Sequence, residues 1–427
     1  MTRKMKDSGV EWIGGIPESW ELVKIGQHFK QRNEKVSDLD FKPLSVTKNG
    51  IVPQLDNAAK SSNHNDRKLV KKGDFVINSR SDRKQSSGIA YEDGSVSLIN
   101  LVIKSRTVDT NFTNYLLKNA GFAEEFYRWG NGIVADLWST KWDSMKRIPI
   151  PLPELAEQKK VANVIRDKVK IIDTIISETQ QSIDELKKYK QALITETVTK
   201  GLDKNVEMKD SGIDILPSIP TSWKIQKIKN LFSMNKGLSI TKENLEDNGI
   251  PVISYGEIHS KYGFNFDPTK DFVRNVPESF VQSDKQAILH KGDFVFADTS
   301  EDIEGSGNFT CFTGNVTTFA GYHTVILKAK ANFNHQYVAY LFDSKIFRSQ
   351  IQKNVQGIKV FSITQRILKD QWIWLPPIEV QENIVSFLDK KRIIINQMID
   401  NKIAELMELE SYKKALIYEY VTGKKEA

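Results

Sequence analysis

The chain is poor in cysteine and has no long apolar run. Cys311 is its one cysteine among 427 residues, which excludes an internal disulfide and predicts a reducing, cytoplasmic location. No stretch reaches the ~18 consecutive apolar residues that a membrane-spanning helix needs. The polar start, Met1 to Lys6, also lacks the apolar core of an export signal. We therefore expect no membrane partner.

Motifs for catalysis are missing as well. The six histidines show no metal-ligand spacing, so no metal site is expected. No phosphate-binding loop is present, because Thr422-Gly-Lys-Lys425 lacks both the leading glycine and the final hydroxyl residue. The Asn/Asp-Pro-Pro-Tyr/Phe segment expected of an adenine methyltransferase is absent too. The sequence predicts no catalytic residue and no cofactor on this chain.

The chain contains an internal duplication, in which one sequence frame occurs twice. The ends of the two halves are alike, whereas the middles differ in length and in almost every residue. A duplicated frame with two unlike inserts suggests one scaffold that holds two different readers. The repeated segments are Met5-Lys-Asp-Ser-Gly9 with Met208-Lys-Asp-Ser-Gly212, Ile16-Pro-Glu-Ser-Trp20 with Ile219-Pro-Thr-Ser-Trp223, Lys72-Gly-Asp-Phe75 with Lys291-Gly-Asp-Phe294, and Tyr189-Lys-Gln-Ala-Leu-Ile194 with Tyr412-Lys-Lys-Ala-Leu-Ile417.

The excess of positive over negative charge lies in the unlike inserts. Residues 21–147 hold 21 basic and 15 acidic side chains, and residues 224–371 hold 18 basic and 15 acidic ones. The shared segment 154–203 has nine of each sign. A basic excess on two lobes suits a polyanion, because phosphate contacts release counterions. The alternative is a basic surface that serves solubility alone.

Each half ends in a predicted long helix, over residues 158–200 and 381–422, with Gly201 and Gly423 at the stop. Apolar residues recur there with alternating spacings of four and three, as in a coiled coil. The seams are Ile165, Val169, Ile172, Ile176, Thr179, Ile183, Leu186, Lys190 and Leu193, and Leu388, Arg392, Ile395, Ile399, Lys402, Leu406, Leu409, Lys413 and Leu416.

The two predicted helices most economically pair with each other, and a homodimeric coiled coil is the alternative. Lys and Arg side chains within the seams leave room for other subunits to pack there. The candidate partner-binding residues are Ile172, Ile176, Ile183, Leu186, Ile395, Ile399, Leu406 and Leu409.

The inserts are predicted to be mixed α/β. We expect strands at residues 75–77, 97–103, 294–296 and 322–327, and helices at residues 112–128 and 333–351. The two Lys-Gly-Asp-Phe segments are expected only to launch a strand, with glycine supplying the turn.

This arrangement resembles the specificity subunit of type I restriction-modification enzymes. The motifs that carry the resemblance are Ser8-Gly-Val-Glu-Trp-Ile-Gly14, Ile16-Pro-Glu-Ser-Trp20, Pro151-Leu-Pro-Glu-Leu-Ala-Glu-Gln158, Leu375-Pro-Pro-Ile-Glu-Val-Gln381 and the two Lys-Gly-Asp-Phe turns. The second copy departs from the pattern at Asp214-Ile-Leu-Pro217, where the packing is expected to differ.

The resemblance implies an α+β fold: two mixed α/β target recognition domains separated by two long antiparallel coiled-coil helices, internally duplicated with pseudo-twofold symmetry. The domains would be residues 1–153 and 204–376, and the spacer helices residues 154–203 and 377–427. Each domain would read one half of a bipartite site in double-stranded DNA. The implied partners are two modification (methyltransferase) subunits, which carry S-adenosylmethionine, and restriction (motor-nuclease) subunits.

Candidate DNA contacts lie in polar loops that follow or join the predicted strands. In the first domain, Arg80, Arg83 and Lys84 suit guanine or phosphate, and Asn78 and Gln85 suit adenine. A loop that contacts only phosphate is the alternative. The further candidates are Lys141 in the first domain and Tyr255, Lys261, Lys359, Ser362 and Gln365 in the second. Glu301-Asp-Ile-Glu304 is interpreted as a solvated loop.

Two other classes of function remain open from the residues. One is a stand-alone DNA-binding regulator or architectural protein, although regulators usually reach two half-sites by homodimer symmetry. The other is a scaffold without a DNA role, against which the localised basic charge argues.

Overall fold

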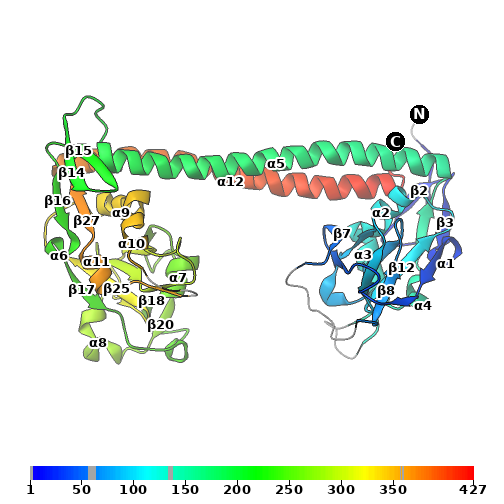
Figure 1. The fold of residues 1–427 in the computed structure, drawn as a ribbon, viewed down its shortest axis with the longest axis horizontal. Helices are drawn as coiled ribbons and strands as arrows, with labels where there is room; N and C mark the ends of the chain where they lie inside the picture. The colour runs from blue at the N-terminus through cyan, green and yellow to red at the C-terminus, as the bar shows by residue number, and fades with distance from the viewer. Residues whose placement is uncertain (1–2, 56–63, 133–137, 356, 358–359) are drawn as a thin grey trace. The chain divides into compact units, whose positions relative to one another are not determined.

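The computed structural model describes residues 3–55, 64–132, 138–355, 357 and 360–427. They form two compact units (Figure 1). Unit 1 comprises Met1–Gln181 with Lys402–Ala427, and unit 2 comprises Ser182–Asn401. Each unit thus holds one insert together with part of each long helix. The four-segment domain division stays a prediction.

The two long helices are present as predicted. α5 spans Leu155–Lys200 and α12 spans Ile378–Val421. The glycines that follow, Gly201 and Gly423, have φ of +79° and +72°, the left-handed conformation that ends helices.

The helices pair antiparallel within the chain, and this confirms the predicted intramolecular arrangement. In unit 1, Lys413 Nζ lies 2.6 Å from Asp173 Oδ1. In unit 2, Lys190 Nζ donates to Asn396 Oδ1 at 2.9 Å. From the first contact to the second, the residue number rises by 17 on α5 and falls by 17 on α12, as it must when the two helices run antiparallel. All predicted seam positions are buried or half-buried in one chain, so no second copy is needed to cover them.

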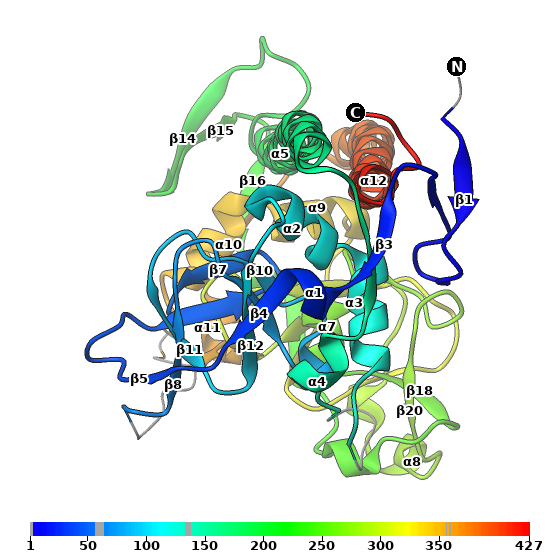
Figure 2. The same cartoon turned by 90° about the vertical axis from the view of Figure 1, so that its right-hand side faces the viewer.

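Unit 1 is built on a four-stranded antiparallel sheet of order β10-β9-β12-β4, with a second sheet of order β11-β8-β5 beside it. Figure 2 looks along the helix pair, with α2 between that pair and the sheets. The strands are β1 (Met5–Asp7), β2 (Gly15–Pro17), β3 (Glu21–Lys24), β4 (Phe29–Arg32), β5 (Lys35–Val36), β6 (Leu44–Thr47), β7 (Gly50–Pro53), β8 (Arg67–Val70), β9 (Phe75–Asn78), β10 (Ser87–Ile89), β11 (Gly94–Ser97), β12 (Asn100–Ser105) and β13 (Pro149–Leu152). The helices are α1 (Ile25–His28), α2 (Thr110–Lys118), α3 (Ala120–Arg128) and α4 (Trp142–Met145), with a 3₁₀ turn at Ser81–Arg83.

Unit 2 repeats this plan with a five-stranded sheet of order β17-β25-β21-β23-β19 and a second sheet of order β20-β18-β24. Its strands are β14 (Met208–Ile213), β15 (Leu216–Pro220), β16 (Lys224–Lys227), β17 (Phe232–Lys236), β18 (Ile250–Ile253), β19 (Asn265–Phe266), β20 (Arg274–Val276), β21 (Phe294–Ala297), β22 (Thr299–Ser300), β23 (Phe309–Phe312), β24 (Phe319–Ala320), β25 (Thr324–Ala329), β26 (Phe361–Ser362) and β27 (Trp372–Leu375). Its helices are α6 (Ile228–Leu231), α7 (Tyr255–Ser260), α8 (Phe280–Ser283), α9 (His335–Asp343), α10 (Lys345–Gln352) and α11 (Gln365–Lys369), with 3₁₀ turns at Lys242–Asn244 and Lys285–Ala287.

Three sequence predictions were wrong in detail. Each helix predicted over 112–128 and 333–351 is two helices, because Asn119 and Ser344 interrupt it. The side chains of these residues accept from the backbone N–H groups of Phe122 and Phe347 and so cap a new helix. The strand predicted over 97–103 is also divided, since a turn at residues 98–99 sends β11 and β12 into different sheets.

A β-strand begins at the end of each Lys-Gly-Asp-Phe turn, as predicted. Gly73 and Gly292 have φ of +91° and +94°, and the strands β9 and β21 follow directly. The aspartates then brace the turn: Asp74 accepts from Lys71 N at 2.9 Å and Asp293 from His290 N at 2.9 Å. In both units the strand that follows the turn is an interior strand of its sheet.

Candidate nucleic-acid interface

In unit 1 the structure joins two loops that the sequence had proposed separately. Thr140 N donates to Ser79 O and Ser81 N to Trp138 O, each at 2.9 Å. The hydroxyls of Ser79 and Ser139 also lie 2.9 Å apart. Residues 78–88, which we call the first reading loop, are thereby held against the segment that enters α4.

Unit 2 contains the same junction. Ile363 N donates to Asp298 O at 2.7 Å, and β22 pairs antiparallel with β26 so that Thr299 faces Ser362. Residues 298–308, the second reading loop, follow β21 as the first reading loop follows β9. In both units a loop from the central strand therefore meets the segment before a short helix.

The basic side chains of the first reading loop are exposed and paired to acids. Arg80 and Arg83 share Asp82, at 3.3 and 3.8 Å, and Lys84 Nζ lies 2.9 Å from Glu124. Ion pairs this exposed contribute little to stability, so the cations remain free to exchange partners. Beside them is a hollow of about 420 Å³, lined by Ser81, Asp82, Lys84, Glu124, Tyr127, Arg128 and Trp138.

Asn78 and Gln85 occupy more constrained positions. Asn78 is buried, its Oδ1 accepts from Arg80 N at 3.0 Å, and its carbonyl accepts from Tyr127 Oη at 2.9 Å. Gln85 is half-buried with a left-handed φ of +65°. Both residues shape the loop in this structure. Lys141 is exposed immediately before α4. Base contact by these three stays a prediction.

The candidates of unit 2 are spread over three elements. Tyr255, in α7, makes an edge contact with Tyr322 at 5.6 Å between ring centroids. Lys261 holds its Nζ 3.6 Å from the centre of the Phe272 ring. Ser362 is exposed in β26 and Gln365 begins α11, so both lie at the loop junction. Lys359 lies outside the described residues. DNA contact by these residues stays a prediction.

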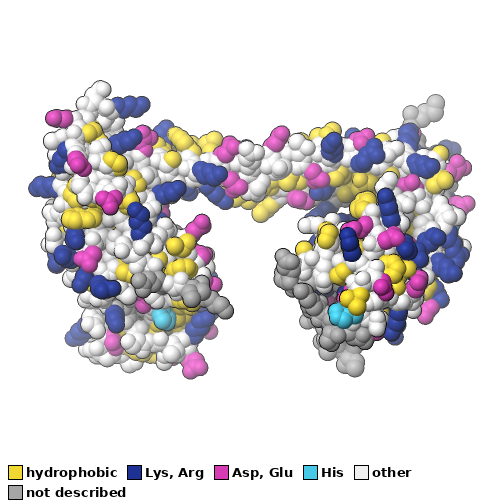
Figure 3. Space-filling model, in the orientation of Figure 1, with side chains coloured by type: hydrophobic (Ala, Val, Ile, Leu, Met, Phe, Trp, Pro, Cys, Tyr) yellow, Lys and Arg dark blue, Asp and Glu magenta, His cyan; other side chains and the backbone are white. Residues whose placement is uncertain are grey.

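The second reading loop is acidic where the first is basic. Residues 298–304 contain Asp298, Glu301, Asp302 and Glu304 and no cation. Asp298 accepts from Thr299 Oγ1 at 2.6 Å, and residues 301–304 are exposed. The two junctions therefore share their backbone pairing and differ in charge. On the face seen in Figure 3, basic and acidic side chains are interspersed over each unit.

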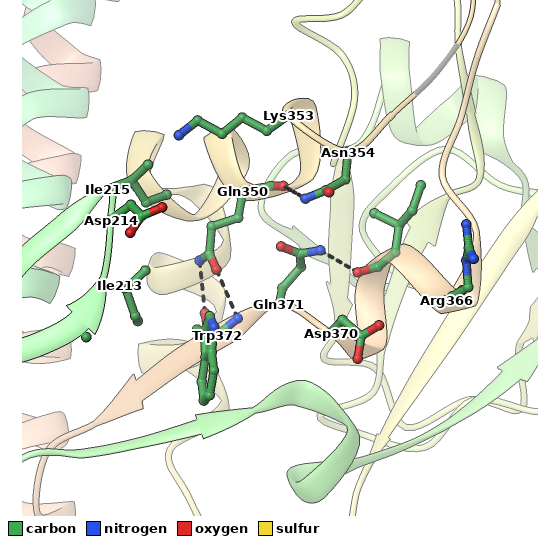
Figure 4. Close-up of a pocket in the computed structure, with 12 residues that line it drawn as sticks. Ile213, Asp214, Ile215, Gln350, Lys353, Asn354, Arg366, Asp370, Gln371 and Trp372 are labelled. Atoms are coloured by element: carbon green, nitrogen blue, oxygen red, sulfur yellow. Dashed lines mark hydrogen bonds between the residues drawn. The ribbon is translucent and has the colours of Figure 1, made fainter.

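A hollow of about 570 Å³ beside the hairpin β14–β15 marks where the second copy departs from the first (Figure 4). Gln350 closes one wall: its Nε2 donates to Trp372 O at 3.0 Å, and its Oε1 accepts from Trp372 N at 2.9 Å. Ile215 and Asn354 line the hollow, at the positions that Trp12 and Trp129 occupy in unit 1. Trp12 is buried there, with its ring 5.8 Å from that of Phe122. Smaller side chains thus leave this space open in unit 2.

The predicted partner-binding residues lie between α5 and α12. Ile172, Ile183, Ile395 and Ile399 are buried there, and Ile176, Leu186, Leu406 and Leu409 are half-buried. Apolar side chains outside the heptad frame are the ones left open to solvent, among them Ile171, Ile393, Ile394 and Met407. The heptad pattern did not predict these solvent-exposed residues. Their apolar character outside the heptad frame was the feature of the sequence that could have indicated them. Yellow side chains on the helices in Figure 3 show such exposure.

The described residues hold no group of three or more His, Cys, Asp or Glu side chains placed to bind a metal ion. Burial raises the pKa of the Cys311 thiol to about 12, so a thiolate nucleophile does not form at neutral pH. Within the part of the chain that the structure describes, no helix is long and apolar enough to cross a membrane.

Known proteins resemble the chain at the level of sequence and of fold. The family described as type I restriction modification DNA specificity domain matches residues 220–408. The type I restriction enzyme MjaVIII specificity subunit of Methanocaldococcus jannaschii is 25% identical over 422 residues, covering 96% of this chain and 93% of that protein.

Two solved structures share the fold over nearly the whole chain. A chain from a structural study of complex assembly and conformational transition in the type I R-M system has a TM-score of 0.71 at 15% identity, covering 96% of this chain and 99% of its own. The HsdS subunit from Thermoanaerobacter tengcongensis has a TM-score of 0.52 at 16% identity, covering 98% of this chain and all of its own (100%).

Proposed function

Because the chain belongs to the family of type I restriction-modification specificity subunits, we propose that each of its two domains reads one half of a bipartite DNA site. The observation that carries the proposal is the repeated loop junction. The pairing of Ser79 with Thr140 recurs as that of Asp298 with Ile363, while the side chains around it differ. A shared frame with unlike side chains suits two readers of different sequences.

In this proposal the chain itself performs no chemistry. Two modification subunits dock on the helix pair of α5 and α12 and bring S-adenosylmethionine, and restriction subunits join that complex. The exposed apolar side chains of the helices support docking, because apolar groups left in water favour burial against a partner. The length of the helix pair would set the gap between the half-sites.

Within unit 1, the exposed cations of the first reading loop support DNA contact. Arg80, Arg83 and Lys84 can leave their weak surface ion pairs for guanine edges or phosphates. The acidic second reading loop gives a different preference, since carboxylates accept from the amino group of cytosine. The two half-sites should therefore differ in sequence.

The test is adenine-methylation mapping of DNA from cells that express the chain with its modification subunit. We expect methylation at two unlike half-sites separated by a fixed gap of unspecified sequence. Replacing residues 21–147 with the equivalent segment of another specificity subunit should change one half-site and leave the other intact. Methylation by the purified chain alone would contradict the proposal, as would a swap that changes both half-sites together.

A stand-alone regulator is the competing function, and the same experiment separates the two. A regulator would bind its site without a modification subunit and would direct no methylation. Gel-shift titration of the purified chain against DNA, with and without the modification subunit, provides the second readout.

A further inference from the structure

A buried glutamine occupies the first turns of each long helix. Gln158 in α5 and Gln381 in α12 are each 3% exposed. Gln158 Nε2 donates to Pro153 O at 2.8 Å, and Gln381 Nε2 donates to Pro376 O at 2.7 Å. Each glutamine therefore ties its helix to the extended segment that leads into it, β13 in unit 1 and β27 in unit 2.

The other end of each amide reaches into the recognition domain. Gln158 Oε1 accepts from Asp109 N and Gln381 Oε1 accepts from Asn334 N, both at 2.8 Å. Asp109 and Asn334 are the N-cap residues of α2 and α9, whose side chains accept from the next helical N–H groups. The N-cap's own N–H has no partner within the helix, so the glutamine provides its hydrogen bond.

α2 and α9 are also held by a second set of contacts in each unit. In unit 1, Phe112 of α2 makes an edge contact with Trp20 at 6.5 Å. Trp20 in turn packs against Gly423 at the end of α12, where a Cβ on the glycine would lie 3.3 Å from the indole. Each recognition domain thus touches the start of one long helix through glutamine and the end of the other through tryptophan.

In unit 2 the corresponding aromatic contact between the recognition domain and the end of a long helix is accompanied by hydrogen bonds. Tyr337 of α9 makes an edge contact with Trp223 at 6.5 Å, and its hydroxyl donates to Val198 O of α5 at 3.3 Å. Trp374 Nε1 donates to the same carbonyl at 2.5 Å. Aromatic packing allows small rotations, whereas the two directional bonds of an amide restrict them.

We infer that Gln158 and Gln381 are positioning residues that fix the angle of each recognition domain on the helix pair, and thereby restrict the complex to one gap length between half-sites. This inference rests on the proposed function. A domain that can tilt at its glutamine would bring its reading loop to a neighbouring base-pair step, because consecutive steps are only about 3.4 Å apart. The duplication supports the role, since both halves keep the same residue with the same two bonds while their reading loops differ.

The test uses Gln158→Met and Gln381→Met, singly and together, in the full chain with its modification subunit. Methionine keeps the buried volume and removes both hydrogen bonds. Gln397→Met, at an exposed position of α12, is the matched control. The readout is the distribution of gap lengths among methylated sites, with circular dichroism and thermal unfolding to establish that each variant folds.

We expect the parent and the control to methylate one gap length. Each single variant should raise methylation at sites with a gap one base pair longer or shorter by roughly ten- to thirtyfold, since two buried hydrogen bonds are lost. The half-site sequences should not change, and the double variant should broaden the distribution further. An unchanged single gap length in a folded double variant would overturn the inference, even if the variant has lost stability.

If a methionine variant fails to fold, Gln158→Leu and Gln381→Leu take its place. Leucine also removes both hydrogen bonds, adds no buried charge and fills most of the buried volume. The same broadening is expected, and an unchanged gap in a folded leucine variant would again overturn the inference. Absence of any bipartite methylation by the parent chain would contradict the proposed function instead, so the two failures are distinguishable.

Discussion

At the scale of single residues, the first reading loop keeps its cations available without leaving them unpaired. Asp82 serves both Arg80 and Arg83, and the Arg83 side chain is still 70% exposed. One carboxylate shared between two guanidinium groups holds neither strongly, because exposed ion pairs are worth ~0–1 kcal/mol. A bidentate contact with guanine is worth more, ~1–3 kcal/mol of discrimination. Under the proposed function, we therefore expect these arginines to exchange Asp82 for a base at little cost.

The prediction at this scale concerns Arg83→Ala. We expect a loss of ~1–3 kcal/mol at one position of the first half-site, which relaxes the specificity there and leaves the second half-site unchanged. The measurement is binding of the assembled complex to a set of single-base variants of the site. Arg166→Ala, an exposed arginine of α5 paired with Asp167, is the control and should have no effect. A uniform loss at every position with a shallower salt dependence would identify a phosphate contact instead.

At the scale of elements, the two hairpins show how one frame accepts different packing. The hairpin β1–β2 is anchored by Trp12, which is buried against Phe122 of α3. The hairpin β14–β15 carries Ile215 at the same position, half-buried beside an open hollow. We therefore expect Trp12 to contribute more to the stability of unit 1 than Ile215 contributes to that of unit 2.

The corresponding prediction compares Trp12→Ala with Ile215→Ala. Truncating a buried tryptophan typically costs ~3–5 kcal/mol, and a half-buried isoleucine should cost clearly less. Denaturant unfolding followed by circular dichroism measures both variants. The transition that reports unit 1 should shift for Trp12→Ala, and Ile215→Ala should produce the smaller shift in unit 2. Equal losses would show that the hairpins stabilise both units alike.

At the scale of the whole molecule, the helix pair is the element that both units share. Its seam repeats every seven residues, so its length changes without loss of packing only in whole heptads on both helices. The contacts of Asp173 with Lys413 and of Lys190 with Asn396 fix the register between the helices. Under the proposed function, the length of this pair corresponds to the gap between half-sites.

The prediction is therefore made for a matched insertion of one heptad after Gln181 in α5 and one after Asn401 in α12. Seven residues at ~1.5 Å each lengthen the pair by about 10 Å, or about three base pairs. Methylation mapping should show a gap longer by about three base pairs with both half-sites intact. A seven-residue insertion in α5 alone is the control, because it puts the two seams out of register and should abolish methylation. An unchanged gap in the active double insertion would mean that the helices tether the readers without setting their spacing.

The amino-acid sequence was enough to predict the duplication, the two long helices with their seams, and the glycines that end them. These features depend on local periodicity and backbone conformation, which a short stretch of chain expresses on its own. It also predicted that the helices pair within one chain, because two complementary apolar stripes occur in the same molecule. It missed the breaks at Asn119 and Ser344, where a polar side chain competes for backbone N–H groups inside an otherwise helical pattern.

Which distant segments meet became visible only in the folded chain. Ser79 pairs with Thr140 and Asp298 with Ile363 across more than 60 residues, and no local pattern specifies such partners. The same holds for Gln158 and Gln381, whose motifs were visible while their contacts with Asp109 and Asn334 were not. A hydrogen bond between segments far apart forms only after the sheets and helices have packed. The reading loops and the glutamine contacts were therefore decided by the folded chain, because only folding brings their two sides within bonding distance.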